Sequence, residues 1–573
     1  MLSREEVKQD LLRLKEIAIK HMAPGTSGAI HKEVIDGIEL NVFSHIPQTL
    51  GEVYRLGLEI SDRDFLVYQD ERFTFGETYD LASKLARILI GHYDISAGDR
   101  VAICSRNNPQ WCIAYMAITM IGAIVVPMNS WWTGREMKYP LEDSGCKLLI
   151  ADQQRIDRIR PFLDSLDLQI IAIKPDSGQS FPEFHQLIEE KECTDINLAD
   201  VKVSADDSAS IMYTSGATGL PKGVLSSHRN ITHSLYSWLF AKEINDILRP
   251  ELVEENPPFE PSILANVPLF HVTGCNAQFL ACFVNQRKFV MMYKWNAEAA
   301  LRLIEQERIT VLHGVPTMTW EIMESPDFEK TDLSSLRSVQ SGGAARPPEH
   351  LALMLKKFPA MAIPGLGYGL TETSAIGAII TGKFYQANPR STGRPVPPVT
   401  QIKIVDEHGN TLGTEQVGDI CIKGPCVMKG YWNNPEDTRA VLKDGWFHSG
   451  DIGMLDDLNF LTILDRAKDI VIRGGENIGC AEVEYAIAEH SAVSEVSVYG
   501  IPDNRLGEIP CASVMLKPEK KLESDELKIF LKNKLAQFKI PEHIFFQYEQ
   551  LPRIASGKIA KKQLREQVIA QTS

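Results

Sequence analysis

The sequence predicts an α/β protein with two domains: a large N-terminal domain of parallel sheets with helices plus a β subdomain, and a smaller mobile α+β C-terminal domain. Its 573 residues exceed the size at which one hydrophobic core stops growing, so at least two domains of unequal size are expected. Through the first two-thirds, β-branched runs alternate with helix-length amphipathic stretches, which is typical of parallel sheets covered by helices. Between Gly393 and Leu464, short strands and turn signals indicate an antiparallel β subdomain.

The order of elements along the chain sets the expected domain limits. We expect an N-terminal helical extension over residues 1–44, a large domain over 45–466 and a small mobile domain over 467–573. The extension is expected to pack on the large domain, because it lacks the basic face of a membrane helix. A homodimer contact or a membrane surface is the alternative. Strands are predicted in the large domain at Val101–Cys104, Lys147–Ala151, Gln169–Ile173, Ile263–Val267, Lys288–Met292 and Thr310–His313. In the small domain, strands are predicted at Asp469–Arg473, Val493–Tyr499 and Cys511–Leu516, and helices at Ala481–His490 and Ser524–Leu535.

The segment from Trp111 to Met128 carries no charge and is nearly long enough to span a membrane. It is preceded by a helix-capping Asn108 and by a proline at the first helical position, and Gly122 interrupts it. These breaks predict a buried helix that runs into a buried parallel strand, and no transmembrane segment.

The composition excludes some partners. The formal net charge is −15 and Lys and Arg do not cluster, so a nucleic-acid partner is not expected. An anionic ligand would have to be bound locally by backbone amides, a few cations and a metal ion. The ten cysteines are scattered without a metal-ligand spacing, and the start lacks a secretory signal, so the expected location is cytoplasmic.

The most informative local pattern is the hydroxyl- and glycine-rich segment Tyr213–Val224. Its backbone amides can approach phosphate oxygens closely, its hydroxyls add hydrogen bonds and Lys222 adds positive charge. The positions of Gly216, Gly219 and Lys222 do not fit the P-loop pattern of other nucleotide enzymes. A flexible connection between two elements is the alternative.

A second segment, Gly367–Thr373, combines an aromatic ring, a hydroxyl group and a carboxylate. Such a set can stack on a base, contact a phosphate and bind Mg²⁺ through one carboxylate, although a capped turn explains it equally well. Three further polar blocks follow towards the C-terminus, and each alone is an ordinary loop pattern. They are Trp446–Asp451, the run from Leu464 to Ile478, and Leu551–Lys558.

Together and in this order, the five blocks resemble the adenylate-forming (AMP-binding) superfamily, which contains acyl-CoA synthetases, firefly luciferase and adenylation domains of peptide synthetases. The resemblance extends from about Phe73 to Lys562. It implies the adenylate-forming enzyme fold and an ATP-dependent carboxylic acid–CoA ligase. Such an enzyme forms acyl-AMP and pyrophosphate, and then acyl-CoA and AMP. ATP, Mg²⁺, coenzyme A and a small carboxylic acid would therefore be its ligands.

The resemblance also implies a nucleotide site. Tyr368 would lie against the adenine, Thr371 would contact the α-phosphate, and Asp451 and Arg466 would bind the ribose hydroxyls. Ala217 stands where the family commonly has Thr, so one hydroxyl contact to phosphate is missing. The full ATP/AMP-binding set would be Thr214, Ser215, Gly216, Thr218, Gly219, Lys222, Gly343, Ala344, Gly367, Tyr368, Gly369, Thr371, Asp451 and Arg466.

The implied catalytic residues are Lys558, Glu372, Thr214 and His271, with Glu372 as the metal ligand. Lys558 resembles the family's mobile lysine, whose ammonium neutralises the charge that builds between the carboxylate and the α-phosphate. By the same resemblance, Lys468 is the hinge of the small domain. Gly474 and Gly475 would line the path of the coenzyme A thiol arm after that domain rotates.

The implied acyl pocket contains His271, Val315, Gly342 and Gly343. Amino-acid adenylation domains carry Asp at the position of His271, so a free amino acid is not expected, and a buried core histidine is the alternative reading of this residue. A medium- or long-chain fatty acid is the expected substrate, with an aryl acid as the alternative. An acyl-AMP ligase that loads a carrier protein is disfavoured because no insertion stands between Asp451 and Lys468. A non-catalytic nucleotide sensor would be expected to lack Lys558 or Glu372, and both are present.

Overall fold

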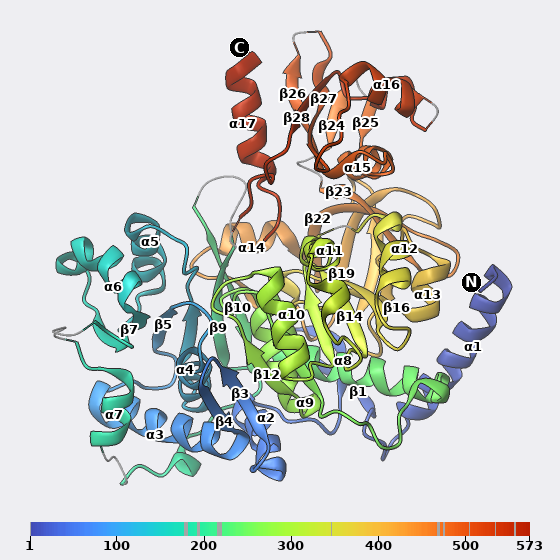
Figure 1. Cartoon of the computed structure of the whole chain (residues 1–573). Coiled ribbons are helices and arrows are strands. Elements are labelled where there is room, and N and C mark those ends of the chain that lie inside the picture. Colours follow the sequence, from blue (N-terminus) through green and yellow to red (C-terminus); the bar gives the residue numbers. More distant parts are fainter. Residues whose placement is uncertain are drawn as a thin grey trace.

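The computed structural model describes the whole chain except residues 1, 177–180, 192–194, 215–219, 345, 467–469, 474–475, 504, 533, 555–556 and 573. The large domain contains two main sheets with a layer of helices between them and further helices outside (Figure 1). One sheet has the strand order β20 (Gly430–Tyr431), β10 (Lys222–Ser227), β9 (Ser208–Thr214), β6 (Ile124–Pro127), β5 (Arg100–Cys104), β7 (Leu148–Asp152) and β8 (Gln169–Ile173). Its β6, β5, β7 and β8 are parallel, as the sequence predicts.

The second sheet holds most of the parallel strands that point towards the candidate site. Its order is β17 (Arg394–Pro395), β16 (Ala378–Thr381), β15 (Ile363–Tyr368), β14 (Ser338–Gly342), β13 (Val311–Gly314), β11 (Ser262–Ala265), β12 (Lys288–Met291), β3 (Asp64–Tyr68) and β4 (Glu71–Thr74). The strands from β15 to β3 pair in parallel, and the outer pairs are antiparallel.

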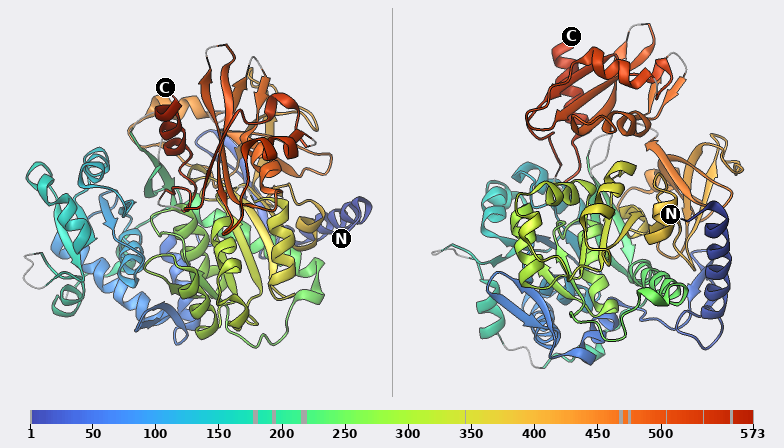
Figure 2. Two further views of the ribbon diagram at one scale, coloured as in Figure 1. Left: turned by 45° about the horizontal axis from the view of Figure 1, so that its top comes forward. Right: turned by 45° about the vertical axis from the view of Figure 1, so that its right-hand side comes forward.

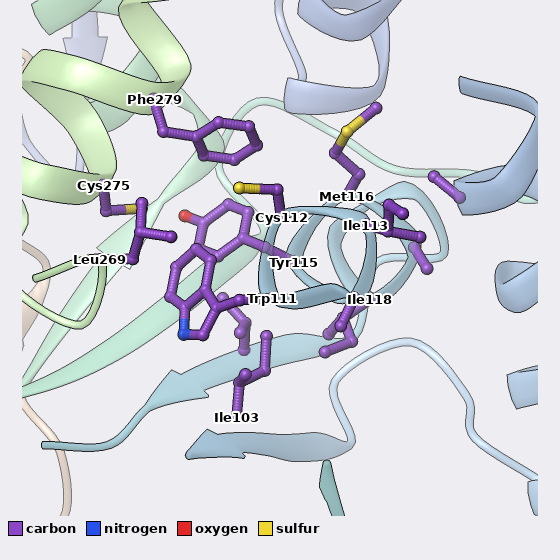
Figure 3. Packing of buried hydrophobic residues seen from close by; sticks show 14 of the residues in the cluster. Ile103, Trp111, Cys112, Ile113, Tyr115, Met116, Ile118, Leu269, Cys275 and Phe279 are labelled. Carbon is purple, nitrogen blue, oxygen red and sulfur yellow. The ribbon is translucent and has the colours of Figure 1, made fainter. Parts of the chain in front are cut away.

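The central layer explains the uncharged segment at Trp111. It forms α4 (Pro109–Met120), whose N-terminus is capped by the Asn108 side chain, and the chain then enters β6. Figure 3 shows Trp111, Tyr115 and Cys112 of this helix packed beside Phe279 and Cys275 of the π-helix η5 (Thr273–Leu280). The predicted buried helix and parallel strand are confirmed. Within the described part of the chain, every helix is either too short or too polar to span a bilayer.

Helices cover both sheets and the rims of the large domain. They are α2 (Leu50–Arg55), α3 (Phe75–Tyr93), α5 (Gly134–Ser144), α6 (Gln153–Ile159), α7 (Phe184–Glu190), α8 (His228–Leu248), α9 (Ala281–Asn285), α10 (Ala297–Gln306), α11 (Pro316–Glu324), α12 (Pro348–Lys357), α13 (Gly382–Ala387) and α14 (Pro435–Val441). Short 3₁₀ turns are η1 (Leu56–Ile60), η2 (Arg160–Ser165), η3 (Leu198–Asp200), η4 (Pro250–Leu252), η6 (Phe328–Lys330), η7 (Thr371–Thr373) and η8 (Gln537–Lys539).

The predicted β subdomain is present as an antiparallel sheet separate from the two main sheets. Its strands are β18 (Gln401–Val405), β19 (Gly418–Lys423), β22 (Trp446–Leu455) and β21 (Leu442–Lys443), with β23 (Leu461–Arg466) paired to β22. Arg466 is the last residue of β23. The predicted domain limit at 466 and 467 stays a prediction, and residues 467–469, including Lys468, lie outside the described residues.

The C-terminal unit is an α+β layer that stands above the large domain in Figure 1 and in the right-hand view of Figure 2. Its sheet contains β25 (Glu476–Ile478), β24 (Val471–Arg473), β27 (Gly507–Leu516), β26 (Val493–Asp503) and β28 (His543–Gln547), and its helices are α15 (Cys480–Ala488), α16 (Ser524–Lys532) and α17 (Lys561–Thr572). The strands β26 and β27 run further than predicted, because Gly500–Asp503 pair with Gly507–Pro510 despite their glycines and prolines.

The N-terminal extension packs on the large domain, as expected. Its helix α1 (Arg4–His21) begins with a capping box between Ser3 and Glu6 and contacts α8 and α13. Asp10 of α1 pairs with Arg249 at the end of α8. The hairpin of β1 (Ile30–Ile35) and β2 (Ile38–Phe43) that follows is not predicted from the sequence.

Candidate active site

The carboxyl ends of neighbouring parallel strands bring several predicted site residues to one edge of the second sheet. Gly314 of β13 is level with Ser341 of β14, and Gly342 is level with Gly367 of β15. The next residues along the three strands therefore lie at the same edge, where ligands of α/β proteins bind. These residues are Val315, Gly343, Ala344, Tyr368 and Gly369.

Tyr368, Asp451 and Arg466 form one hydrogen-bonded group at this edge. The Tyr368 hydroxyl donates to Asp451 Oδ2 at 2.7 Å, and Arg466 Nε lies 3.0 Å from Asp451 Oδ1. Asp451 is buried, and burial raises the pKa of its carboxyl, while Arg466 and Tyr368 act in the opposite direction. Arg466 is half-exposed, so the group joins a half-buried tyrosine and a buried carboxylate to a cation that reaches the solvent.

Lys558 of the C-terminal unit lies at the same edge of the second sheet, next to Gly343. A Cβ atom on Gly343 would lie 3.1 Å from Lys558 Cε and 3.5 Å from Nζ. Burial lowers the pKa of Lys558 to about 8; the cation of Arg466 adds to this, and Asp451 opposes it. The preceding Gly557 packs on the start of α11, because a Cβ there would be 3.3 Å from Val315 Cγ2. The C-terminal unit therefore faces the large domain with its lysine inside the cleft.

His271 is half-buried and lies near Lys558. Burial, and next the Lys558 ammonium, lower the pKa of His271 to about 3, so the ring is neutral. Its Nδ1 accepts the backbone N–H of Thr273 at 3.2 Å, which leaves the proton of the neutral ring on Nε2. The turn that follows needs glycine, because a Cβ on Gly274 would lie 2.2 Å from the Pro268 carbonyl oxygen.

Tyr431 contacts both Glu372 and Lys222. The hydroxyl of Tyr431 donates to Glu372 Oε1 at 2.9 Å, and the Lys222 ammonium lies 5.2 Å from the centroid of the same ring. Lys222 also pairs with Asp437 at 2.7 Å, and this ammonium holds the pKa of the Asp437 carboxyl below its usual range. Burial is the largest influence on Glu372 and raises the pKa of its carboxyl.

The structure describes only the two ends of the predicted phosphate loop. Thr214 and Lys222 face each other across the hairpin of β9 and β10, with Thr214 Oγ1 at 3.4 Å from the Lys222 carbonyl oxygen. After the loop, residues 222–227 pair with β9 before α8 begins. The predicted residues Ser215, Gly216, Thr218 and Gly219, the variant Ala217, and the predicted thiol-path residues Gly474 and Gly475 lie outside the described residues.

Sequence reasoning missed Tyr431 and Asp437. Tyr431 is the last residue of the short strand β20 and pairs with Val224 of β10, and Asp437 follows in α14. The sequence signal nearby is the helix start at Asn434–Pro435, which comes just after an aromatic residue. Such a pattern is common in loops and does not indicate a binding or catalytic role by itself.

A pocket of about 770 Å³ adjoins the Lys558 loop. Its lining includes Gly557, Met318, Asn266, Arg106 and Trp131. The Arg106 guanidinium carbon lies 4.9 Å from the centroid of Trp131, and Arg106 Nε is buried without a recorded partner among the described residues. The pocket is within the size range of sites that enclose a small molecule.

Comparison with known proteins identifies the family. The model for the AMP-binding enzyme family matches residues 59–432, and that for the AMP-binding enzyme C-terminal domain matches residues 482–558. The chain belongs to the family of AMP-binding enzymes.

Three similar proteins illustrate the relationship. A long-chain-fatty-acid–CoA ligase of Bacillus subtilis (strain 168) is 32% identical over 538 residues, which are 88% of this chain and 92% of that protein. A feruloyl-CoA synthase of Amycolatopsis sp is 32% identical over 488 residues, 85% of this chain and 92% of that protein. The structure of o-succinylbenzoate CoA synthetase (MenE) from Bacillus subtilis, in complex with the acyl-adenylate intermediate, matches with a TM-score of 0.73 and 29% identity, covering 90% of this chain and 97% of that one.

These findings confirm the predicted fold and the predicted class of enzyme, an AMP-forming acid–thiol ligase that works with ATP, Mg²⁺ and coenzyme A. The comparisons do not define the acid, because the three similar proteins are named for a long-chain fatty acid, a feruloyl group and o-succinylbenzoate. The roles given to single residues stay predictions, as do the homodimer and the cytoplasmic location.

Proposed function

We propose that the chain activates a carboxylic acid in the cleft between Gly343, Tyr368 and Lys558, and then transfers the acyl group to coenzyme A. The observation that carries this proposal is the position of Lys558, which lies against Gly343 at the edge that also holds the Tyr368–Asp451–Arg466 group. This position supports the proposal, because a cation there could neutralise the charge of a carboxylate and an α-phosphate bound at the same edge.

In the first step, a carboxylate oxygen of the acid attacks the α-phosphorus of ATP, and the bond from that phosphorus to the leaving pyrophosphate breaks. The Lys558 ammonium neutralises the charge that builds on the phosphoryl oxygens. His271 is neutral with its proton on Nε2, so we assign it the positioning of the acid carboxylate by a hydrogen bond. Asp451 and Arg466 are assigned to the ribose hydroxyls, and Tyr368 to the adenine.

The residues around Glu372 suit a magnesium ion. Glu372 offers a carboxylate oxygen, the ligand type that Mg²⁺ prefers, and Tyr431 orients the group by its hydrogen bond. When bound, the ion would offset the charge of the triphosphate. Lys222, held between Tyr431 and Asp437, is assigned to the terminal phosphates.

In the second step, the thiolate of coenzyme A attacks the acyl carbonyl carbon, and the bond from that carbon to the AMP oxygen breaks. We propose that the thiol arm approaches through the pocket of about 770 Å³. Its lining includes Arg106 beside Trp131, and Lys294, which fit a ligand that combines phosphates with an aromatic base. The lining also includes Gly557, which precedes Lys558 in the chain.

For the acid, a medium- or long-chain fatty acid is our first candidate. One observation favours an oxygenated acid as the second candidate. Within the part of the chain that the structure describes, Asn266 Nδ2 and Gln278 Oε1 are buried without hydrogen-bond partners. Gln278 Nε2 donates to Asn266 Oδ1 at 3.0 Å and to the His313 carbonyl oxygen at 2.6 Å. These groups lie beside Gly314, and a buried polar atom without a partner is satisfied when a ligand supplies one.

The deciding experiment measures pyrophosphate release from ATP and Mg²⁺ with a panel of fatty, aryl, keto- and dicarboxylic acids, with and without coenzyme A. We expect release with at least one acid class, and acyl-CoA only when coenzyme A is present. Replacing coenzyme A by a phosphopantetheinylated carrier protein tests the alternative acceptor. If no acid yields AMP, a non-catalytic nucleotide-binding protein is favoured, and the proposed function is wrong.

A further inference from the structure

Asp419, Cys421 and His448 bring one carboxylate, one thiol and one imidazole together in the β subdomain, outside the candidate active site. Among the described residues, the ligand atoms of these three lie within 4.8 Å of one another. His448 Nδ1 is 2.7 Å from Asp419 Oδ2 and 3.4 Å from Cys421 Sγ, and Cys421 Sγ is 3.7 Å from Asp419 Oδ2. All three atoms therefore face one small space.

The strand pairing explains how the three side chains meet. Asp419 and Cys421 are two residues apart on β19, so their side chains lie on the same face. Cys421 pairs with His448 of β22, whereas Asp419 pairs with Ile452, so β22 contains a bulge between these points. The bulge leaves His448 opposite both β19 residues.

The distances suit a borderline-soft divalent cation. Zinc binds Cys sulfur at about 2.3 Å and His nitrogen or carboxylate oxygen at about 2.0–2.2 Å, so tetrahedral ligand atoms lie roughly 3.3–3.6 Å apart. Two of the three separations are already close to this, and only the pair at 2.7 Å must open by roughly half an ångström. We propose that Asp419, Cys421 and His448 form a three-ligand binding site for Zn²⁺ whose fourth ligand is water.

Access and neighbouring charges agree with this site. The side chains of His448 and Asp419 are 19% and 24% exposed, while Cys421 is buried, so an ion enters from the solvent side and reaches the thiol. Lys403, the cross-strand partner of Cys421, is directed to the ring of Trp446, with its ammonium 4.5 Å from the ring centroid. Magnesium prefers oxygen ligands, so the proposed Mg²⁺ ligand Glu372 and this site select different ions.

The same bulge connects the zinc site to the nucleotide half of the cleft. It contains Gly450, whose N–H donates to Asp419 Oδ1 at 3.1 Å, and it ends at Asp451, which binds Tyr368 and Arg466. Movement of Asp419 and His448 onto an ion therefore shifts the bulge that places Asp451. This part of the inference rests on the proposed nucleotide role of Asp451, and zinc binding itself does not.

The first test titrates the full chain with Zn²⁺ alone, in competition with a chromophoric chelator. We expect one tightly bound equivalent, at least tenfold weaker binding in Cys421→Ser and His448→Gln, and unchanged binding in Cys426→Ser, a buried cysteine of the same subdomain outside the cluster. Thermal unfolding confirms that each variant is folded. Equal affinity of the wild type and Cys421→Ser overturns the site.

The second test measures pyrophosphate release with Zn²⁺ added at a large excess of Mg²⁺. We expect Zn²⁺ to raise the KM for ATP several-fold in the wild type and in Cys426→Ser, and to have little effect in Cys421→Ser. Equal inhibition of the wild type and Cys421→Ser overturns the connection to Asp451. Since the binding test needs no turnover, failure of the proposed ligase function would not be mistaken for failure of the zinc site.

Discussion

Lys558 Cε would lie only 3.1 Å from a Cβ atom on Gly343, although the two residues belong to opposite sides of the cleft. The backbone of Gly343 also has a φ of +77°, which L residues rarely adopt. The absence of a side chain at this position therefore admits the lysine to the site.

We expect Gly343→Ala to reduce pyrophosphate release by about 10–100-fold, because displacement by about 1 Å can cost this much in a positioned catalytic group. The matched control is Gly409→Ala, which has a φ of +85° and nothing within 4 Å of the added Cβ. That variant carries the backbone strain without the contact. Similar loss of activity in both variants would show that strain, and not the approach of Lys558, is responsible.

Lys558→Ala is expected to slow adenylate formation by about 10²–10³-fold, which is typical for loss of one group that stabilises transition-state charge. Transfer of the acyl group from supplied acyl-adenylate to coenzyme A should remain nearly unchanged. The two half-reactions are measured separately, by pyrophosphate release and by thioester formation. Equal loss in both would contradict the assigned role.

The rate of adenylation should fall as the pH rises through about 8. Burial near Arg466 lowers the pKa of Lys558 to about 8, so the charged form that neutralises the phosphoryl oxygens is present below this pH and lost above it. The measurement is kcat/KM for pyrophosphate release between pH 6 and about 10. In Lys558→Arg the remaining activity should not decline in that range, because a guanidinium stays charged. A decline that persists in this variant must come from another group.

Tyr431→Phe separates the two contacts of one ring. The substitution keeps the aromatic face beside Lys222 and removes the hydrogen bond to Glu372 Oε1. We expect the Mg²⁺ concentration needed for half-maximal activity to rise several-fold, with the KM for ATP little changed at saturating Mg²⁺. Tyr431→Leu, which removes the ring as well, should also raise the KM for ATP. If Tyr431→Phe leaves the Mg²⁺ dependence unaltered, Glu372 is not oriented by this hydroxyl.

Glu321 of α11 contacts the segment that carries Lys558. Its Oε1 accepts a hydrogen bond from Gln550 Nε2 at 2.6 Å and lies 3.5 Å from Arg553, which also pairs with Glu495. Glu321→Ala should slow adenylation several-fold and leave thioester formation from acyl-adenylate unchanged, because it removes contacts that hold the C-terminal unit in this orientation. Glu329→Ala, which removes an exposed charge elsewhere, is the control. Slower thioester formation in Glu321→Ala would argue against an effect on orientation alone.

Local sequence patterns were sufficient for much of the fold. The strands β5, β7, β8, β11, β12 and β13 follow the predicted runs closely, because buried parallel strands need continuous apolar, β-branched segments. The helix α4 and the strand β6 were predictable from Asn108, Pro109 and Gly122, which mark the ends of the apolar run. The β1–β2 hairpin was missed although Asp36–Gly37, which joins its two partly exposed strands, is a hairpin-turn signal.

The class of fold, the family and the chemical groups available to the site follow from the amino-acid sequence, since these depend on patterns within short segments and on the order of five such segments. Which of those groups meet depends on how the chain folds. Lys558 lies against Gly343, Tyr431 joins Glu372 to Lys222, and a bulge in β22 turns His448 towards Asp419 and Cys421. Each of these contacts joins residues far apart in the chain, so it depends on strand order, register and domain packing, which local patterns do not encode.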